Sequence, residues 1–286
     1  MKDFNFIKNV ENIKNDIKNI LNKEPYNKKR KKKKDEIIKK LQDHFPTWST
    51  NNIYNEECPD IYAGEIIDSS VSAWFNTSER ETKIEKNGSE CLNPTEKKDE
   101  YKTIVIILES PHTDEYDQNT GSSIPIPNPA LKSTGEKLQK YIKSLIKAII
   151  NQRKGKGLCP NIDTGNYRII LMESIPYQCS LGHVNGKKIN PDIRDLIFNK
   201  TWELNEIKNY FNERLESYKP DFIINCCTGG KDENCLRSKV QKLIEEYKNK
   251  NTSTELYFGN HPSLWTGPNN IIWYSEYPDE QIKFDK

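Results

Sequence analysis

Thr103-Ile104-Val105-Ile106-Ile107-Leu108, followed at once by Glu109-Ser110-Pro111-His112, is the stretch that decides the fold. A run of apolar and β-branched residues of this length is typical of a strand that is buried on both faces of a parallel sheet. The polar cluster begins where the run ends. In open α/β sheets, functional groups gather at the carboxyl ends of the strands. The stretch therefore predicts a parallel α/β fold with polar side chains at the strand ends.

Further strand and helix patterns alternate along the rest of the chain. We expect strands at 103–108, 167–172, 222–227 and 256–258, and helices near 135–150, 204–218 and 236–247. A closing run at 271–274 is expected to add an edge strand or to pack as a loop. This alternation predicts an α/β fold of three layers with a central, mostly parallel sheet of four strands.

The first hundred residues differ from this pattern. Residues 1–43 hold fourteen Lys or Arg residues against seven Asp or Glu residues, a net charge of +7, although the whole chain carries +2. The run Lys28–Lys34 is suited to nucleic-acid phosphates and equally to a solvated surface. Residues 50–100 are polar and irregular, as in loops with short helices. We therefore divide the chain into a basic, helical and irregular extension, 1–100, and a catalytic α/β domain, 101–286.

Composition narrows the environment of the protein. The chain has no run of about 18 apolar residues and no apolar signal segment at its amino end, so we expect a cytoplasmic protein without a membrane partner. The seven cysteines are odd in number and irregularly spaced, which argues against a disulfide framework. Cys226, Cys227 and Cys235 are expected to be small buried side chains rather than metal ligands.

A second motif follows the strand expected at 256–258. It reads Gly259-Asn260-His261-Pro262-Ser263-Leu264-Trp265 and holds one of only four histidines. A histidine at a strand exit can stabilise negative charge on a leaving group, while Ser263 and backbone amides can hold a phosphate. Ser133 and Thr134, with Gly135, precede a helical pattern and offer similar groups to a phosphate.

The order and spacing of these motifs resemble the uracil-DNA glycosylase superfamily over roughly residues 101–275. The first motif of that family is a strand followed by Gly-Gln-Asp-Pro-Tyr-His or Gly-Glu-Ala-Pro-Gly, which Leu108-Glu109-Ser110-Pro111-His112 matches in part. Its last motif is His-Pro-Ser, which His261-Pro262-Ser263 matches fully. The resemblance implies a monofunctional DNA glycosylase that flips a base out of double-stranded DNA, excises it and leaves an abasic site, without a metal or a cofactor.

The resemblance also implies roles for individual residues. His261 would donate to the departing base, with Asn260 beside it in the substrate site. Leu264 or Trp265 would be the apolar wedge that fills the gap left by the flipped nucleotide. The residues that would grip DNA phosphates are Ser133, Thr134 and Ser263.

Two departures from the family pattern concern the catalytic water. Ser110 stands where the best-known members have the water-positioning Asp. Glu109, Asp114 and Glu115 are the possible substitutes. We favour Glu109, because it lies immediately at the strand end.

Three further departures concern the base. Glu173 replaces the Asn that reads uracil, and a carboxylate can accept a hydrogen bond from the N4 amino group of cytosine. Ala130 replaces a stacking Phe and leaves volume, and His112 replaces a Tyr that rejects substituents. These changes predict a hydroxymethylated or glucosylated cytosine, as in phage DNA, and a similarity to antiviral glycosylases. The alternatives are a catalytically silent protein that binds modified nucleotides or DNA, and a uracil-DNA glycosylase of base-excision repair. A nuclease is disfavoured, because the chain lacks a clear Asp and Glu-x-Lys constellation.

Overall fold

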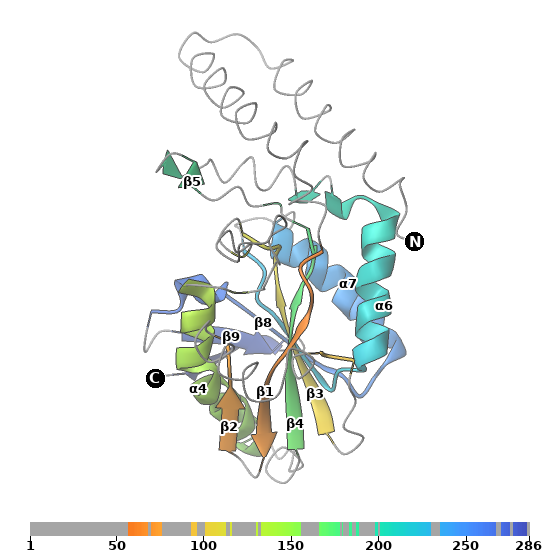
Figure 1. Cartoon of the computed structure of the whole chain (residues 1–286). Helices are drawn as coiled ribbons and strands as arrows, with labels where there is room; N and C mark the ends of the chain where they lie inside the picture. Colours follow the sequence, from red (N-terminus) through yellow and green to blue (C-terminus); the bar gives the residue numbers. More distant parts are fainter. Residues whose placement is uncertain are drawn as a thin grey trace.

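Two packed helix layers enclose a mixed sheet in the computed structural model of this chain (Figure 1). The structure describes residues 57–67, 70–75, 93–95, 101–112, 115, 130, 133–155, 166–177, 179, 183–184, 187–188, 198–199, 201–229, 235–266, 270–274 and 277–284. The basic run Lys28–Lys34 and Asp114 lie outside these described residues.

Four parallel strands form the centre of the sheet. β3 (Tyr101–Leu108) pairs on one side with β4 (Asn166–Glu173) and on the other with β7 (Phe222–Asn225), and β7 pairs with β8 (Glu255–Gly259). All four strands were predicted from the sequence, to within two residues at each end. In the register of β3 and β4, Leu108 lies opposite Glu173, so the carboxyl ends of these two strands are neighbours.

The sheet is larger than the predicted four strands, and it is mixed. β1 (Ile61–Ile67) and β2 (Ser70–Ala73) extend one edge and β9 (Asn270–Tyr274) and β10 (Tyr277–Phe284) the other, all through antiparallel pairings, so that the order is β10-β9-β8-β7-β3-β4-β1-β2. A separate hairpin joins β5 (His183–Val184) and β6 (Lys187–Lys188).

β1 and β2 correct two expectations. They lie in the region that was predicted to be loops with short helices, and in the segment that was assigned to the extension before residue 101. The pairing of β1 with β4 joins residues about a hundred positions apart, which a local sequence pattern does not reveal. Gly64 interrupts this ladder with a register shift, and a Cβ atom there would lie 2.7 Å from the carbonyl oxygen of Ser72.

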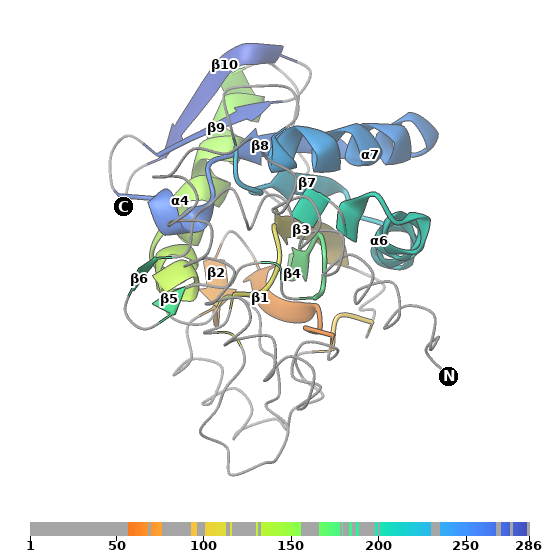
Figure 2. The same cartoon turned by 90° about the horizontal axis from the view of Figure 1, so that it is seen from above.

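The helices cover opposite faces of the sheet, as Figure 2 shows. α4 (Ser133–Gly155) lies on one face, and α6 (Asn205–Tyr218) and α7 (Leu236–Lys250) lie on the other. Successive residues of β3 alternate between the two layers: Ile106 packs in the cluster beneath α4, and Ile107 packs in the cluster beneath α6 and α7. The predicted α/β class and the three predicted helices are therefore confirmed.

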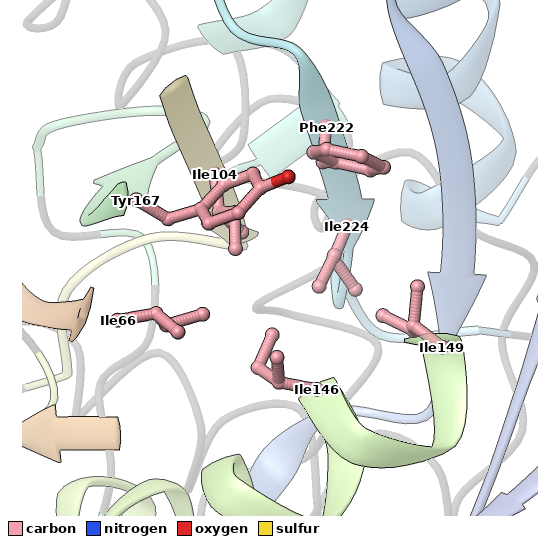
Figure 3. A pocket seen from close by; sticks show the side chains of 7 residues that line it. All are labelled: Ile66, Ile104, Ile146, Ile149, Tyr167, Phe222 and Ile224. Carbon is pink, nitrogen blue, oxygen red and sulfur yellow. The ribbon is translucent and has the colours of Figure 1, made fainter. Parts of the chain in front are cut away.

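A small cavity between α4 and the sheet is shown in Figure 3. Its volume is about 10 Å³, and its walls include Ile146 and Ile149 of α4 and Tyr167 and Phe222 near the beginnings of β4 and β7. An apolar space of this size is at the lower limit for a single water molecule. The cavity is a packing defect near the amino ends of the strands and is too small for a substrate.

Candidate functional site

Three buried glutamates gather where β3 and β4 end. Glu109 and Glu115 are each 5% exposed and Glu173 is 1% exposed. Burial raises the pKa of Glu173 well above its usual range, and the negative charges of Glu115, Glu109 and Asp60 raise it further. The protonated, uncharged form of Glu173 is therefore favoured in the folded protein.

Glu173 also has unused hydrogen-bonding capacity. Its Oε2 atom is buried and has no hydrogen-bond partner within the described part of the chain. Native proteins rarely leave a buried polar atom in this state, and the exceptions concentrate at functional sites. A protonated carboxyl group can donate one hydrogen bond and accept others, so it can recognise a ligand that presents a donor beside an acceptor.

The backbone beyond the strand ends stays tightly paired. The amide of Ser174 donates to the carbonyl oxygen of Leu108 at 2.8 Å, and the amide of Ile175 donates to that of Glu109 at 3.2 Å. The hydroxyl of Ser174 donates to the same Glu109 carbonyl at 2.5 Å. These bonds hold the main chain of Glu109 and Glu173 in fixed positions at the end of the sheet.

Glu115 has a local structural role. One of its carboxylate oxygens, Oε2, accepts a hydrogen bond from the amide of His112 at 2.5 Å, and its own amide donates to the carbonyl oxygen of His112 at 2.9 Å. The Glu115 side chain therefore closes the turn after Pro111 and keeps the half-buried His112 next to the acid cluster. Of the three acids considered for the catalytic water, Glu109 is the one that lies directly at the strand end.

Buried thiols surround the same strand ends. Cys227 donates from Sγ to the carbonyl oxygen of Leu108 at 3.3 Å, and burial raises its pKa well above the usual thiol range. Burial raises the pKa of Cys179, which lies beside Ser110, to about 12. Such thiols remain protonated, so they pack as small side chains and do not act as nucleophiles.

The second motif forms a short turn after β8. The 3₁₀ helix η4 (Pro262–Leu264) begins directly after His261. The Nδ1 atom of His261 accepts a hydrogen bond from the amide of Ser263 at 3.3 Å and lies 2.9 Å from the Ser263 hydroxyl. An uncharged imidazole that accepts at Nδ1 carries its proton on Nε2. His261 is thus prepared to donate from Nε2, while Asn260 is exposed beside it.

Leu264 and Trp265, the two candidate wedges, differ in exposure. Leu264 is 63% exposed, whereas Trp265 is 1% exposed. The Trp265 ring packs edge-on against Tyr141 of α4, and its Nε1 atom donates to the carbonyl oxygen of Asn260 at 3.0 Å. The expectation that Trp265 could enter DNA is therefore wrong: it anchors the turn to α4, and only Leu264 is available as a wedge.

The amino end of α4 is built on a close backbone approach. Ser133 is exposed and Thr134 is half-buried at the first turn, as a phosphate contact requires. Ala130 has a left-handed backbone with φ of 53°, and a Cβ atom on Gly135 would lie 2.0 Å from its carbonyl oxygen. Ala130 is itself fully buried in the cluster beneath α4. The extra pocket volume expected at Ala130 is therefore not found among the described residues.

Sequence reasoning missed a buried ion pair behind the acid cluster. Arg214 of α6 binds Asp60 at 2.9 Å and donates to the carbonyl oxygen of Ser174 at 3.2 Å. The buried positions of α6 are Ile207, Phe211, Arg214, Leu215 and Tyr218. An arginine within such an apolar stripe is a sequence signal for a buried charge that needs a partner.

The described residues contain no group of three or more His, Cys, Asp or Glu side chains arranged to hold a metal ion. Within the same ranges, no helix combines the length and apolar character needed to span a bilayer. Comparisons of the chain with protein-family models, with curated proteins and with solved structures find no match.

Proposed function

We propose that this protein is a DNA glycosylase that hydrolyses the N-glycosidic bond of a modified pyrimidine and leaves an abasic site. The preferred base is a cytosine derivative, such as the hydroxymethylated or glucosylated cytosines of phage DNA. The observation that carries the proposal is the pairing of two motifs on one sheet. His261 follows β8, and Glu109 with Glu173 follows β3 and β4, at the same edge of the parallel strands.

The proposed chemistry matches these groups. Cleavage of the bond gives the sugar oxocarbenium character while the base leaves with negative charge. The Nε2–H of His261 would donate to an oxygen of the departing base, which stabilises the developing anion. Glu109 would position the water that attacks the anomeric carbon, since its main chain is fixed by Ser174 and Ile175.

Recognition of the base is assigned to Glu173. A protonated carboxyl group presents an O–H donor beside a carbonyl acceptor. Cytosine presents the complementary pair, the N3 acceptor beside the N4 amino donor. Uracil presents the same two groups in the opposite order, and a protonated Glu173 could meet it by exchanging its two oxygens. The choice between the two bases is therefore a matter for experiment.

The charge of the surface favours one side of the molecule for DNA. A groove of about 380 Å³ between α6 and α7 is lined by Glu213, Glu216 and Glu246, which would repel phosphates. On the opposite face, α4 begins with Ser133 and Thr134, and η4 packs against α4 with Ser263 and Leu264 exposed. We assign this second side to the DNA backbone.

The test is a base-release assay without added metal. Duplexes that contain uracil, cytosine, hydroxymethylcytosine or glucosylated hydroxymethylcytosine are incubated with the protein, and released bases and abasic sites are measured by mass spectrometry. The proposal predicts release from the modified cytosines. Release of uracil alone would assign the protein to repair of deaminated DNA. Tight binding of modified DNA without release would identify a catalytically silent binding protein.

A further inference from the structure

We infer that Arg214 is a positioning residue of the proposed site, which fixes the end of β4 through the Ser174 carbonyl and faces Glu173 with a positive charge. The inference deepens the proposed function and rests on it for the activity measurement alone. Arg214 lies on α6, behind the strand ends, and belongs to neither of the two motifs.

Arg214 is held firmly from three directions. Its Nη1 atom binds Asp60 Oδ1 at 2.9 Å, and the two side chains are 7% and 3% exposed. The hydroxyl of Tyr218 donates to the other oxygen of Asp60 at 2.8 Å. The guanidinium carbon lies 4.9 Å from the centre of the Tyr210 ring. The Nη2 atom is therefore fixed in direction, and it donates to the carbonyl oxygen of Ser174 at 3.2 Å.

One residue links this network to both acids. Ser174 follows Glu173 directly, and its hydroxyl donates to the carbonyl oxygen of Glu109 at 2.5 Å. The amide of Cys58, two residues before Asp60, donates to the carbonyl oxygen of Pro176 at 2.7 Å and closes the same segment from the other side. A shift of Arg214 would therefore move Ser174, and with it the carboxyl groups of Glu109 and Glu173.

Arg214 also opposes the negative charges around Glu173. The groups that face Glu173 are Glu109 at the end of β3, Glu115 in the following turn, Asp60 before β1, Arg214 on α6, and the thiols of Cys179 and Cys227. Burial is the largest influence on the pKa of Glu173, and the three acids act in the same direction. Arg214 lowers this pKa, so it limits how strongly the site holds its proton.

Three substitutions separate the charge of Arg214 from its geometry. Arg214→Gln removes the positive charge, and we expect the pH at which Glu173 loses its proton to rise by about one unit or more. Asp60→Asn removes a negative charge with little change of shape, and we expect this pH to fall. Arg214→Lys keeps the charge but loses the two-pronged contact, so we expect the pH to stay near its wild-type value. Base release should fall about 10-fold or more in Arg214→Lys, because a displaced catalytic group reacts more slowly.

Arg168 provides the matched control. It is also a buried arginine, and it donates to Thr103 Oγ1 at 2.8 Å and to the carbonyl oxygens of Pro94 and Tyr218 at 3.0 and 3.1 Å. It lies near the beginning of β4, at the end away from Glu173. Arg168→Lys should therefore lower thermal stability, as Arg214→Lys does, without changing the pH profile of kcat/KM.

The protonation of Glu173 is followed by its infrared carboxyl band, which is assigned through its loss in Glu173→Gln. This measurement needs no substrate. Opposite shifts in Arg214→Gln and Asp60→Asn, with none in Arg168→Lys, are the expected result. If Arg214→Gln does not fold, Asp60→Asn alone gives the sign. An unchanged band midpoint in the folded charge variants, or an equal shift in Arg168→Lys, would overturn the inference. If the midpoints shift but the wild-type protein releases no base, the proposed function fails and the positioning role of Arg214 stands.

Discussion

At the scale of single residues, the buried Glu173 makes stability depend on pH. Its pKa is raised in the folded protein, so the folded state binds a proton more strongly than the unfolded chain does. The resulting stabilisation is complete below the usual glutamate pKa and is lost as pH rises toward the folded value. While the unfolded chain has lost the proton and the folded protein keeps it, the free energy of unfolding falls by up to about 1.4 kcal/mol per pH unit.

Glu173→Gln should remove this slope and make the protein more stable than wild type at pH 7. Urea unfolding between pH 4 and pH 8 measures the effect, with Glu213→Gln on the exposed face of α6 as the control. If Glu173→Gln retains the wild-type dependence of stability on pH, the assignment of an uncharged Glu173 is wrong.

Leu264 and Trp265 are adjacent, yet we expect opposite effects from their replacement by alanine. Trp265→Ala should lower the free energy of unfolding by about 3–5 kcal/mol, because it removes a buried ring that packs on Tyr141. Leu264→Ala should change stability by less than about 0.5 kcal/mol, because the side chain is exposed. Under the proposed function it should nevertheless slow base release, since no side chain then fills the flipped nucleotide's place. Chemical unfolding and a base-release assay on both variants would separate the two roles. A large loss of stability in Leu264→Ala would contradict this division.

The residue-level expectations held where a residue ends a recognisable strand. Glu109, Glu173 and Asn260 could be placed from sequence because strand ends are set by local apolar runs. The burial of Trp265 and the turn closed by Glu115 could not, since both depend on a partner elsewhere in space or on the geometry of one turn.

At the scale of elements, the amino end of α4 depends on the missing side chain of Gly135. A Cβ atom there would lie 2.0 Å from the carbonyl oxygen of Ala130 and 2.5 Å from that of Phe75. Because neither backbone group can move freely, Gly135→Ala should cost about 1–3 kcal/mol of stability. Gly229→Ala is the matched control, because the nearest atoms belong to the end of the long Arg237 side chain. Thermal unfolding of both variants tests this, and an equal effect in the two would contradict the argument.

The central elements were predictable and the outer strands were not, for a physical reason. β3, β4, β7 and β8 are buried on both faces and appear in the sequence as apolar runs. β2 alternates between exposed and half-buried residues over only four positions. Its place in the sheet follows from pairing with β1, and that of β1 from pairing with β4, which depends on tertiary contacts.

At the scale of the whole molecule, the folding unit must include residues before 101. Ile61, Ala63, Ile66 and Phe75 are buried in the cluster beneath α4, and Asp60 pairs with Arg214. A chain that begins at residue 101 would expose this cluster and leave Arg214 buried without its partner. We expect it to lose cooperative unfolding, and we expect a chain that begins at residue 57 to retain it. Circular dichroism during thermal unfolding compares the two, and a cooperative transition at the full-length midpoint in the shorter chain would refute the prediction.

The most direct test of the central claim is the rate of base release by Glu109→Gln and His261→Ala. The substrate is a duplex with glucosylated hydroxymethylcytosine, and abasic sites are counted under single-turnover conditions. We predict a loss of about 10²–10³-fold in His261→Ala and about 10²–10⁴-fold in Glu109→Gln, with folding unchanged in both. Wild-type rates in both variants would show that the chemistry occurs elsewhere. Absence of release by the wild-type protein from any modified or unmodified duplex would contradict the proposed activity itself.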